Sequence, residues 1–70
     1  MSTEIRVTVN GEGCGFEPGT TLTGVIRSLD LDPQRVAVEF NRAIVKRDLW
    51  DTTEVEDGSE IEIVMFVGGG

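Results

Sequence analysis

Near both ends of the chain apolar residues recur at every second position, and this constrains the fold more than any other feature. A period of two is typical of a half-buried strand. Residues 5–9 and 61–67 are also the stretches richest in Val and Ile. We therefore predict that they lie side by side and parallel at the centre of one sheet. Their predicted inward positions are Ile5, Val7, Val9, Ile61, Ile63, Met65 and Val67.

Between these segments the pattern predicts one helix and three shorter strands. Residues 22–29 place Leu22, Val25, Ile26 and Leu29 at helical spacing, with Thr21 as the N-cap. Shorter strands are expected at 13–17, 36–40 and 43–45, with turns at 10–11, 41–42 and 57–59. One helix can cover one face of a single mixed sheet. This order predicts an α+β fold with the outline of a β-grasp.

Composition excludes several functional classes. Seventy residues allow one small domain, and a net charge of −7 makes nucleic acid and membrane surfaces poor partners. The chain has no histidine and a single cysteine, Cys14, so neither a zinc-finger spacing nor a Cys/His nucleophile pair is available. No metal site, bound cofactor or catalytic residue is expected. We expect a monomer in the cytoplasm, because no leader or spanning segment is apparent.

The last three residues, Gly68, Gly69 and Gly70, stand out as a separate unit. Glycine has no Cβ, so the tail is expected to be a thin, flexible thread that fits a narrow channel. We divide the chain into a domain over residues 1–67 and a tail over residues 68–70. We predict that the free carboxylate of Gly70 is the functional group of the chain, presented to be activated and loaded. A frayed end without a function is the plainer alternative.

The last strand also predicts a docking surface. Val64 and Phe66 point opposite to the inward residues, toward the face that one helix cannot cover. Together with Ala37 from a neighbouring strand they would form an apolar patch beside the tail. Leu49 and Trp50 are expected to anchor the loop at 48–56, with Trp50 as a lid on the core. The glycines at 11–15 suit a hairpin better than a phosphate-binding loop.

Three segments resemble the ThiS family, the sulfur carriers of thiamine biosynthesis. These are residues 41–50 (NRAIVKRDLW), 57–63 (DGSEIEI) and the ending 66–70 (FVGGG). The chain departs from the family at Lys46, where proline is frequent, and at Met65, where histidine is common. The resemblance implies a ubiquitin-like β-grasp fold and a co-substrate rather than an enzyme.

The resemblance also implies a chemistry for the tail. In the family a ThiF-like adenylating enzyme uses ATP and magnesium to activate the terminal glycine, here Gly70. A sulfur donor protein then converts this end to a thiocarboxylate, and thiazole synthase takes the sulfur. The carrier itself binds no nucleotide. Val64 and Phe66 are the docking candidates, with Gly68 and Gly69 giving the reach.

Three rival functions remain open. The small subunit of molybdopterin synthase resembles the family in fold and tail, although residues 41–50 favour the thiamine carrier. A ubiquitin-like modifier joined to lysines belongs to another class. The third rival is a β-grasp binding module whose tail has no role.

Overall fold

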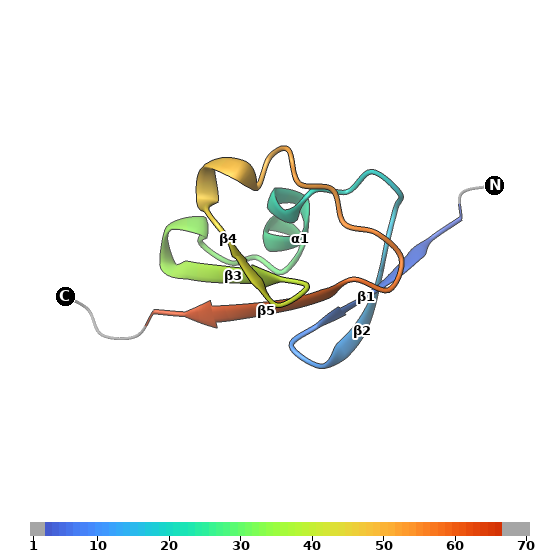
Figure 1. The fold of residues 1–70 in the computed structure, drawn as a ribbon, viewed down its shortest axis with the longest axis horizontal. Helices are drawn as coiled ribbons and strands as arrows, with labels where there is room; N and C mark the ends of the chain where they lie inside the picture. The colour runs from blue at the N-terminus through green and yellow to red at the C-terminus, as the bar shows by residue number, and fades with distance from the viewer. Residues whose placement is uncertain (1–2, 67–70) are drawn as a thin grey trace.

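In the computed structural model, which describes residues 3–66, a five-stranded sheet packs against one helix (Figure 1). The strand order is β2-β1-β5-β3-β4. Helix α1 lies across one face of the sheet, and the other face carries no helix within residues 3–66 (Figure 1). The elements in chain order are β1 (Ile5–Val9), β2 (Glu12–Phe16), α1 (Leu22–Ser28), η1 (Pro33–Arg35), β3 (Val36–Phe40), β4 (Ala43–Val45), η2 (Arg47–Leu49) and β5 (Glu60–Met65).

The first and last strands are parallel neighbours, as predicted. Thr8 lies opposite Glu60, and Val9 lies opposite Ile61. The remaining pairs, β1–β2, β3–β4 and β3–β5, are antiparallel, which makes the sheet mixed. Strand β5 therefore occupies the centre, and the chain passes from the middle of the sheet directly toward the tail.

The core forms between the sheet and α1. Leu22, Val25 and Ile26 contribute the buried face of the helix, and alternate residues of β1, β3 and β5 face them. Burying each such aliphatic side chain stabilises the fold by about 1.5–3 kcal/mol. The buried hydrophobic residues are Val7, Val9, Leu22, Val25, Ile26, Val36, Val38, Trp50, Val55, Ile61 and Ile63.

Helix α1 is short and depends on its cap and its packing. The side chain of Thr21 accepts a hydrogen bond from the backbone N–H of Gly24 at 3.2 Å, as a capping residue should. A Cβ on Gly24 would lie 3.1 Å from Cγ2 of Thr20, so a larger residue there would require that side chain to shift. Leu29 was predicted to continue the apolar stripe. It is instead the exposed C-cap, because the helix ends at Ser28.

The loop after β4 differs from its predicted packing at one position. Trp50 is buried as predicted, and its indole Nε1 donates a hydrogen bond to the carbonyl oxygen of Val45 at 2.9 Å. Leu49 is 51% exposed, so its prediction as an anchor is wrong. The turn of η2 directs the larger residue inward and its neighbour outward. The second inward residue of the segment is Val55, which was not predicted.

Two tight turns join the antiparallel pairs where they were expected. Asn10 and Gly11 have φ values of 50° and 85°, and Asn41 and Arg42 have 50° and 72°. Positive φ at both central positions is the geometry that suits a two-residue hairpin. None of the helices within residues 3–66 is long and apolar enough to cross a bilayer.

Candidate functional site: the end of β5

The candidate site begins where β5 ends. Gly68, Gly69 and Gly70, together with Val67 and the predicted boundary between domain and tail, lie outside the described residues. Their assigned roles therefore stay predictions. The structure describes the segment that leads to them, up to Phe66.

Val64 and Phe66 are both accessible. Val64 is 54% exposed and Phe66 is 56% exposed. Ala37 of β3 lies directly opposite Val64, so these two share the sheet face that α1 does not cover. The exposure and the register agree with the predicted apolar patch. Partner binding by Val64 and Phe66 stays a prediction.

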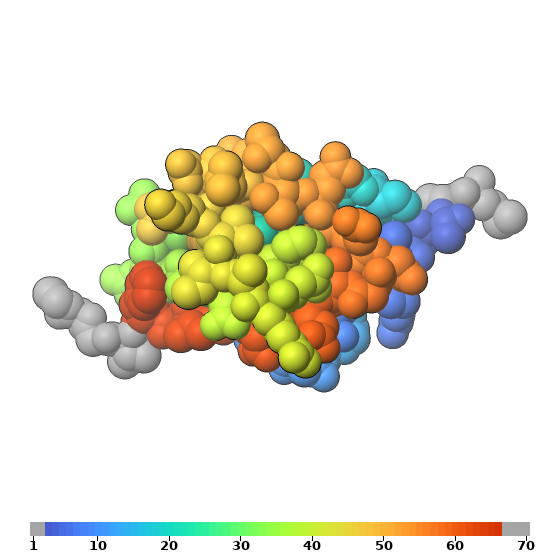
Figure 2. Space-filling view, viewed as in Figure 1, coloured from blue at the N-terminus to red at the C-terminus, as the bar shows by residue number. Residues whose placement is uncertain are grey.

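Met65 was predicted to face inward and so to be buried, and the prediction of burial is wrong. Met65 lies opposite Val36, which is 3% exposed, yet Met65 itself is 56% exposed. Met65 is absent from the core cluster that the seven-residue helix forms with the sheet, so the packing of the helix does not cover this side chain. Val64, Met65 and Phe66 thus form three consecutive exposed apolar side chains, which we call the apolar collar. Figure 2 shows the red end of β5 at the margin of the molecule rather than beneath other elements.

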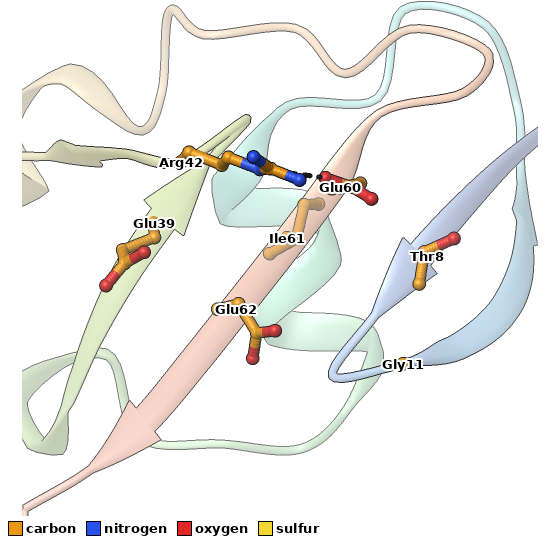
Figure 3. Close-up of a pocket in the computed structure, with 7 residues that line it drawn as sticks. All are labelled: Thr8, Gly11, Glu39, Arg42, Glu60, Ile61 and Glu62. Atoms are coloured by element: carbon orange, nitrogen blue, oxygen red, sulfur yellow. Dashed lines mark ion pairs between the residues drawn. The ribbon is translucent and has the colours of Figure 1, made fainter.

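The uncovered face is acidic next to the apolar collar. Glu60 and Glu62 of β5 project from the same face as Val64, and Glu39 of β3 lies directly opposite Glu62. These side chains line a shallow depression with Thr8 and Arg42 (Figure 3). Arg42 Nε lies 3.7 Å from Glu60 Oε1, and the arginine side chain is 88% exposed. The pairing of Glu39 with Glu62 was not predicted from the sequence, because alternation gives the face of each side chain but not the register between β3 and β5.

Among residues 3–66, the other titratable side chains form no metal-binding or nucleophilic cluster. Cys14 is half-buried on β2 opposite Val7, which places it on the core side of the sheet. In the part of the chain that the structure describes, no group of three His, Cys, Asp or Glu side chains is arranged to hold a metal ion. The arrangement that remains is an exposed strand end with an apolar collar and an acidic face beside it.

A model of the ThiS family matches residues 7–70. The chain belongs to the ThiS family. The match extends from β1 through the glycine run, so it includes the whole of β5 and the predicted tail. ThiS proteins are sulfur carriers of thiamine biosynthesis, and the resemblance predicted from the sequence is confirmed.

Solved structures agree with the family assignment. The crystal structure of the thiamine biosynthesis protein (ThiS) from Geobacter metallireducens superposes with a TM-score of 0.81 at 30% identity. The match covers 94% of this chain and all of that one. This confirms the predicted ubiquitin-like β-grasp.

Two kinds of curated relative are similar in sequence. The sulfur carrier protein ThiS of Bacillus subtilis is 35% identical over 63 residues, which cover 89% of this chain and 96% of that protein. A thiazole synthase from Magnetococcus marinus is 39% identical over 66 residues, which cover 94% of this chain but 20% of that protein. The chain thus spans about a fifth of the length of the thiazole synthases that it matches.

Proposed function

We propose that this ThiS-family chain carries sulfur as a thiocarboxylate on Gly70 and delivers it for thiazole formation in thiamine biosynthesis. One observation carries the proposal beyond family membership. The central strand of the sheet ends in an exposed apolar collar, which only Val67 separates in sequence from the glycine run that the family model includes. A carrier needs an exposed surface near its tail, because a partner enzyme must bind the domain while it acts on the tail.

The chemistry explains why a partner must activate Gly70. A carboxylate is a poor electrophile because its charge is delocalised and oxide is a poor leaving group. In the proposed first step a ThiF-like adenylating enzyme, using ATP and magnesium, joins the Gly70 carboxylate to AMP and releases pyrophosphate. A donor protein then supplies sulfur at the oxidation level of sulfide, which attacks the carbonyl carbon of Gly70. The bond from this carbon to AMP breaks, AMP leaves, and the thiocarboxylate remains. The absence of side chains on Gly68 and Gly69 lets the end enter a narrow active site.

Thiazole synthase is the proposed acceptor of the sulfur. Support comes from the thiazole synthase of Magnetococcus marinus and a second one from Paramagnetospirillum magneticum, in each of which a segment similar to this chain makes up 20% of the length. Domains that act on each other are often joined in one chain, where the linkage raises their effective concentration. Here the collar residues Val64 and Phe66 would provide the contact with each enzyme in turn.

The proposed carrier acts as a monomeric co-substrate and binds no cofactor of its own. We propose a cytoplasmic location, where the ATP for this activation is available. Its net charge of −7, with Glu39, Glu60 and Glu62 beside the collar, favours partners whose docking surface is basic.

Reconstitution of the loading reaction tests the proposal. The full chain is incubated with the adenylating enzyme and sulfur donor of the same organism, ATP and magnesium, and its intact mass is followed. A gain equal to the replacement of one oxygen by sulfur supports the carrier. Adducts on lysine would indicate a ubiquitin-like modifier instead. If the same enzyme preparation adenylates another carrier protein, an unchanged mass of this chain would contradict both the carrier and the modifier hypotheses.

Tail variants show which atoms are required. Deletion of Gly70 and the substitution Gly69→Trp should each abolish loading while the circular dichroism spectrum and thermal midpoint stay unchanged. The matched control is Gly58→Ala, because it changes a turn glycine with φ of 85° and should lower stability without affecting loading. Loading of the Gly70 deletion variant at the normal rate would contradict the proposed site.

A further inference from the structure

The hydrogen bonds between β1 and β5 show which backbone groups of β5 face β1. The N–H of Thr8 donates to the carbonyl oxygen of Ser59 at 2.9 Å, and the N–H of Asn10 donates to that of Ile61 at 2.9 Å. Backbone groups alternate in direction along a strand. The odd-numbered residues of β5 therefore direct their N–H and C=O groups toward β1.

At Ile63 the side chain of Asn10, rather than the backbone of β1, supplies the hydrogen bonds to β5. Asn10 Oδ1 accepts a hydrogen bond from the Ile63 N–H at 2.7 Å, and Asn10 Nδ2 donates to the Ile63 carbonyl oxygen at 3.3 Å. The backbone itself turns away here, because Asn10 and Gly11 form the tight turn into β2. Figure 3 shows β5 continuing beyond the hairpin turn that carries the Gly11 label.

On its other edge β5 stays paired to its end. Val36 of β3 lies opposite Met65, and the N–H of Phe66 donates to the carbonyl oxygen of Arg35 at 2.8 Å. Beyond Ile63, β5 is thus held by β3 alone. By the alternation, the N–H and C=O of Met65 point to the β1 side, where no residue of the described part of the chain pairs with them.

This edge lacks the usual protection against pairing. Exposed strand edges are normally blocked by a charge, a proline, a bulge or a covering element. The charged residues of β5, Glu60 and Glu62, lie before this edge, and the apolar collar contains neither charge nor proline. The side chains of Val64 and Phe66 lie on one face of the strand and that of Met65 on the other. An occupant of the edge would contact both.

We propose that an extended segment of the adenylating enzyme pairs with β5 at Met65, accepting from its N–H and donating to its C=O, while packing on the apolar collar. This inference rests on the proposed function for the identity of the partner. An extended segment fits because it supplies a donor and an acceptor at strand spacing. An enzyme that encloses the glycine tail must also pass along the residues immediately before it, so this contact continues the tail contact.

Hydrogen exchange followed by NMR tests the pairing directly. In the free chain the Met65 amide should exchange at least ~10-fold faster than the amides of Val64 and Phe66, which face β3. Saturation with the adenylating enzyme should slow exchange at Met65 by at least ~10-fold. Unchanged exchange at Met65 in the complex would overturn the inference. Protection that rises with the concentration of the free chain alone would overturn it too, because the occupant would then be a second copy.

Two substitutions distinguish the contribution of the Met65 N–H from that of the Met65 side chain. Met65→Pro removes the N–H that points to the uncovered edge and leaves the pairing with β3 intact, since β3 does not use that N–H. The matched control, Met65→Ala, keeps the N–H and shortens the side chain. Titration calorimetry with the adenylating enzyme should show ~10-fold weaker binding for the proline variant than for the alanine variant. Equal affinities would overturn the inference.

A third variant covers the case in which Met65→Pro unfolds the chain. Chemical synthesis with the α-hydroxy analogue of methionine replaces the Met65 N–H by oxygen and leaves the side chain in place. Its binding should weaken to a similar extent, and unchanged binding would overturn the inference. Loading of Gly70 is followed in the same mixtures, so that loading without protection at Met65 counts against the pairing alone. Protection without loading counts against the proposed sulfur chemistry alone.

Discussion

The side chain of Asn10 is joined to the backbone of Ile63, 53 residues later, by two hydrogen bonds of 2.7 and 3.3 Å. These bonds extend the contact between β1 and β5 by two residues beyond the last backbone pair, Val9 with Ile61. Asn10 also has a φ of 50°, a conformation that asparagine adopts more readily than most residues. One residue therefore closes the hairpin turn and fixes the central strand ahead of the tail.

Asn10→Ala should destabilise the fold by about 2–4 kcal/mol, since it removes both hydrogen bonds and strains the turn. Urea unfolding followed by circular dichroism gives the free energy of unfolding. The control Asn10→Gly tolerates the positive φ, so it reports the hydrogen bonds alone, about 1–3 kcal/mol. If both variants are as stable as the parent chain, the side chain of Asn10 does not hold β5.

Glu39 and Glu62 place like charges directly opposite each other on neighbouring strands. Glu62→Gln should raise the free energy of unfolding by about 0.2–1 kcal/mol at low salt, and the gain should shrink as salt screens the repulsion. The control Glu12→Gln makes the same change in net charge on β2, where the opposite residue is Val9. Equal effects of the two substitutions would show that net charge, rather than the pair, sets the stability.

Trp50 combines burial with a hydrogen bond to the carbonyl oxygen of Val45. Trp50→Phe should cost about 1–3 kcal/mol, because the smaller ring leaves space and the carbonyl loses its donor. Unfolding should be followed by circular dichroism rather than by tryptophan fluorescence, because the substitution removes the chain's one tryptophan. Leu49→Ala, at the exposed neighbouring position, should change stability by less than about 0.5 kcal/mol. A larger loss of stability from Leu49→Ala than from Trp50→Phe would contradict the described packing of the loop.

Phe66→Asp should weaken binding to the adenylating enzyme by ~10-fold or more while changing stability by less than about 1 kcal/mol, because Phe66 is exposed beside the tail. Calorimetric titration measures the affinity, and thermal unfolding checks the fold. Leu49→Asp is the control, with a similarly exposed apolar residue on η2. Unfolding by Phe66→Asp alone would place this side chain in the core.

The alternation of Val and Ile was sufficient to predict the sheet. The segments predicted as strands at 5–9 and 61–67 could be paired from their composition, although β5 runs from Glu60 to Met65 and Val67 lies outside the described residues. The turns at Asn10 and Asn41 followed from residues that tolerate positive φ. The second strand lies one residue earlier than the predicted 13–17. Pattern reasoning succeeds for Val7, Val9, Ile61 and Ile63 because these residues join the same core cluster as the buried face of α1.

The exposure of Met65 and Leu49 could not be predicted in this way. Periodicity gives the direction of a side chain but does not show how far a covering element extends. The helix ends at Ser28 and leaves Met65 uncovered, and the turn of η2 decides between Leu49 and Trp50. The pair of Glu39 with Glu62 depends on register, which requires the structure. The chemistry assigned to Gly70 came from the family resemblance.

The central claim concerns the carboxylate of Gly70, and mass spectrometry of the C-terminal peptide tests it most directly. After reaction with the adenylating enzyme, ATP, magnesium and the sulfur donor, the peptide ending at Gly70 should have one oxygen replaced by sulfur. Fragmentation should place that sulfur on Gly70 itself. Sulfur found on Cys14, or a C-terminal peptide of unchanged mass while the enzyme loads a known carrier, would contradict the account.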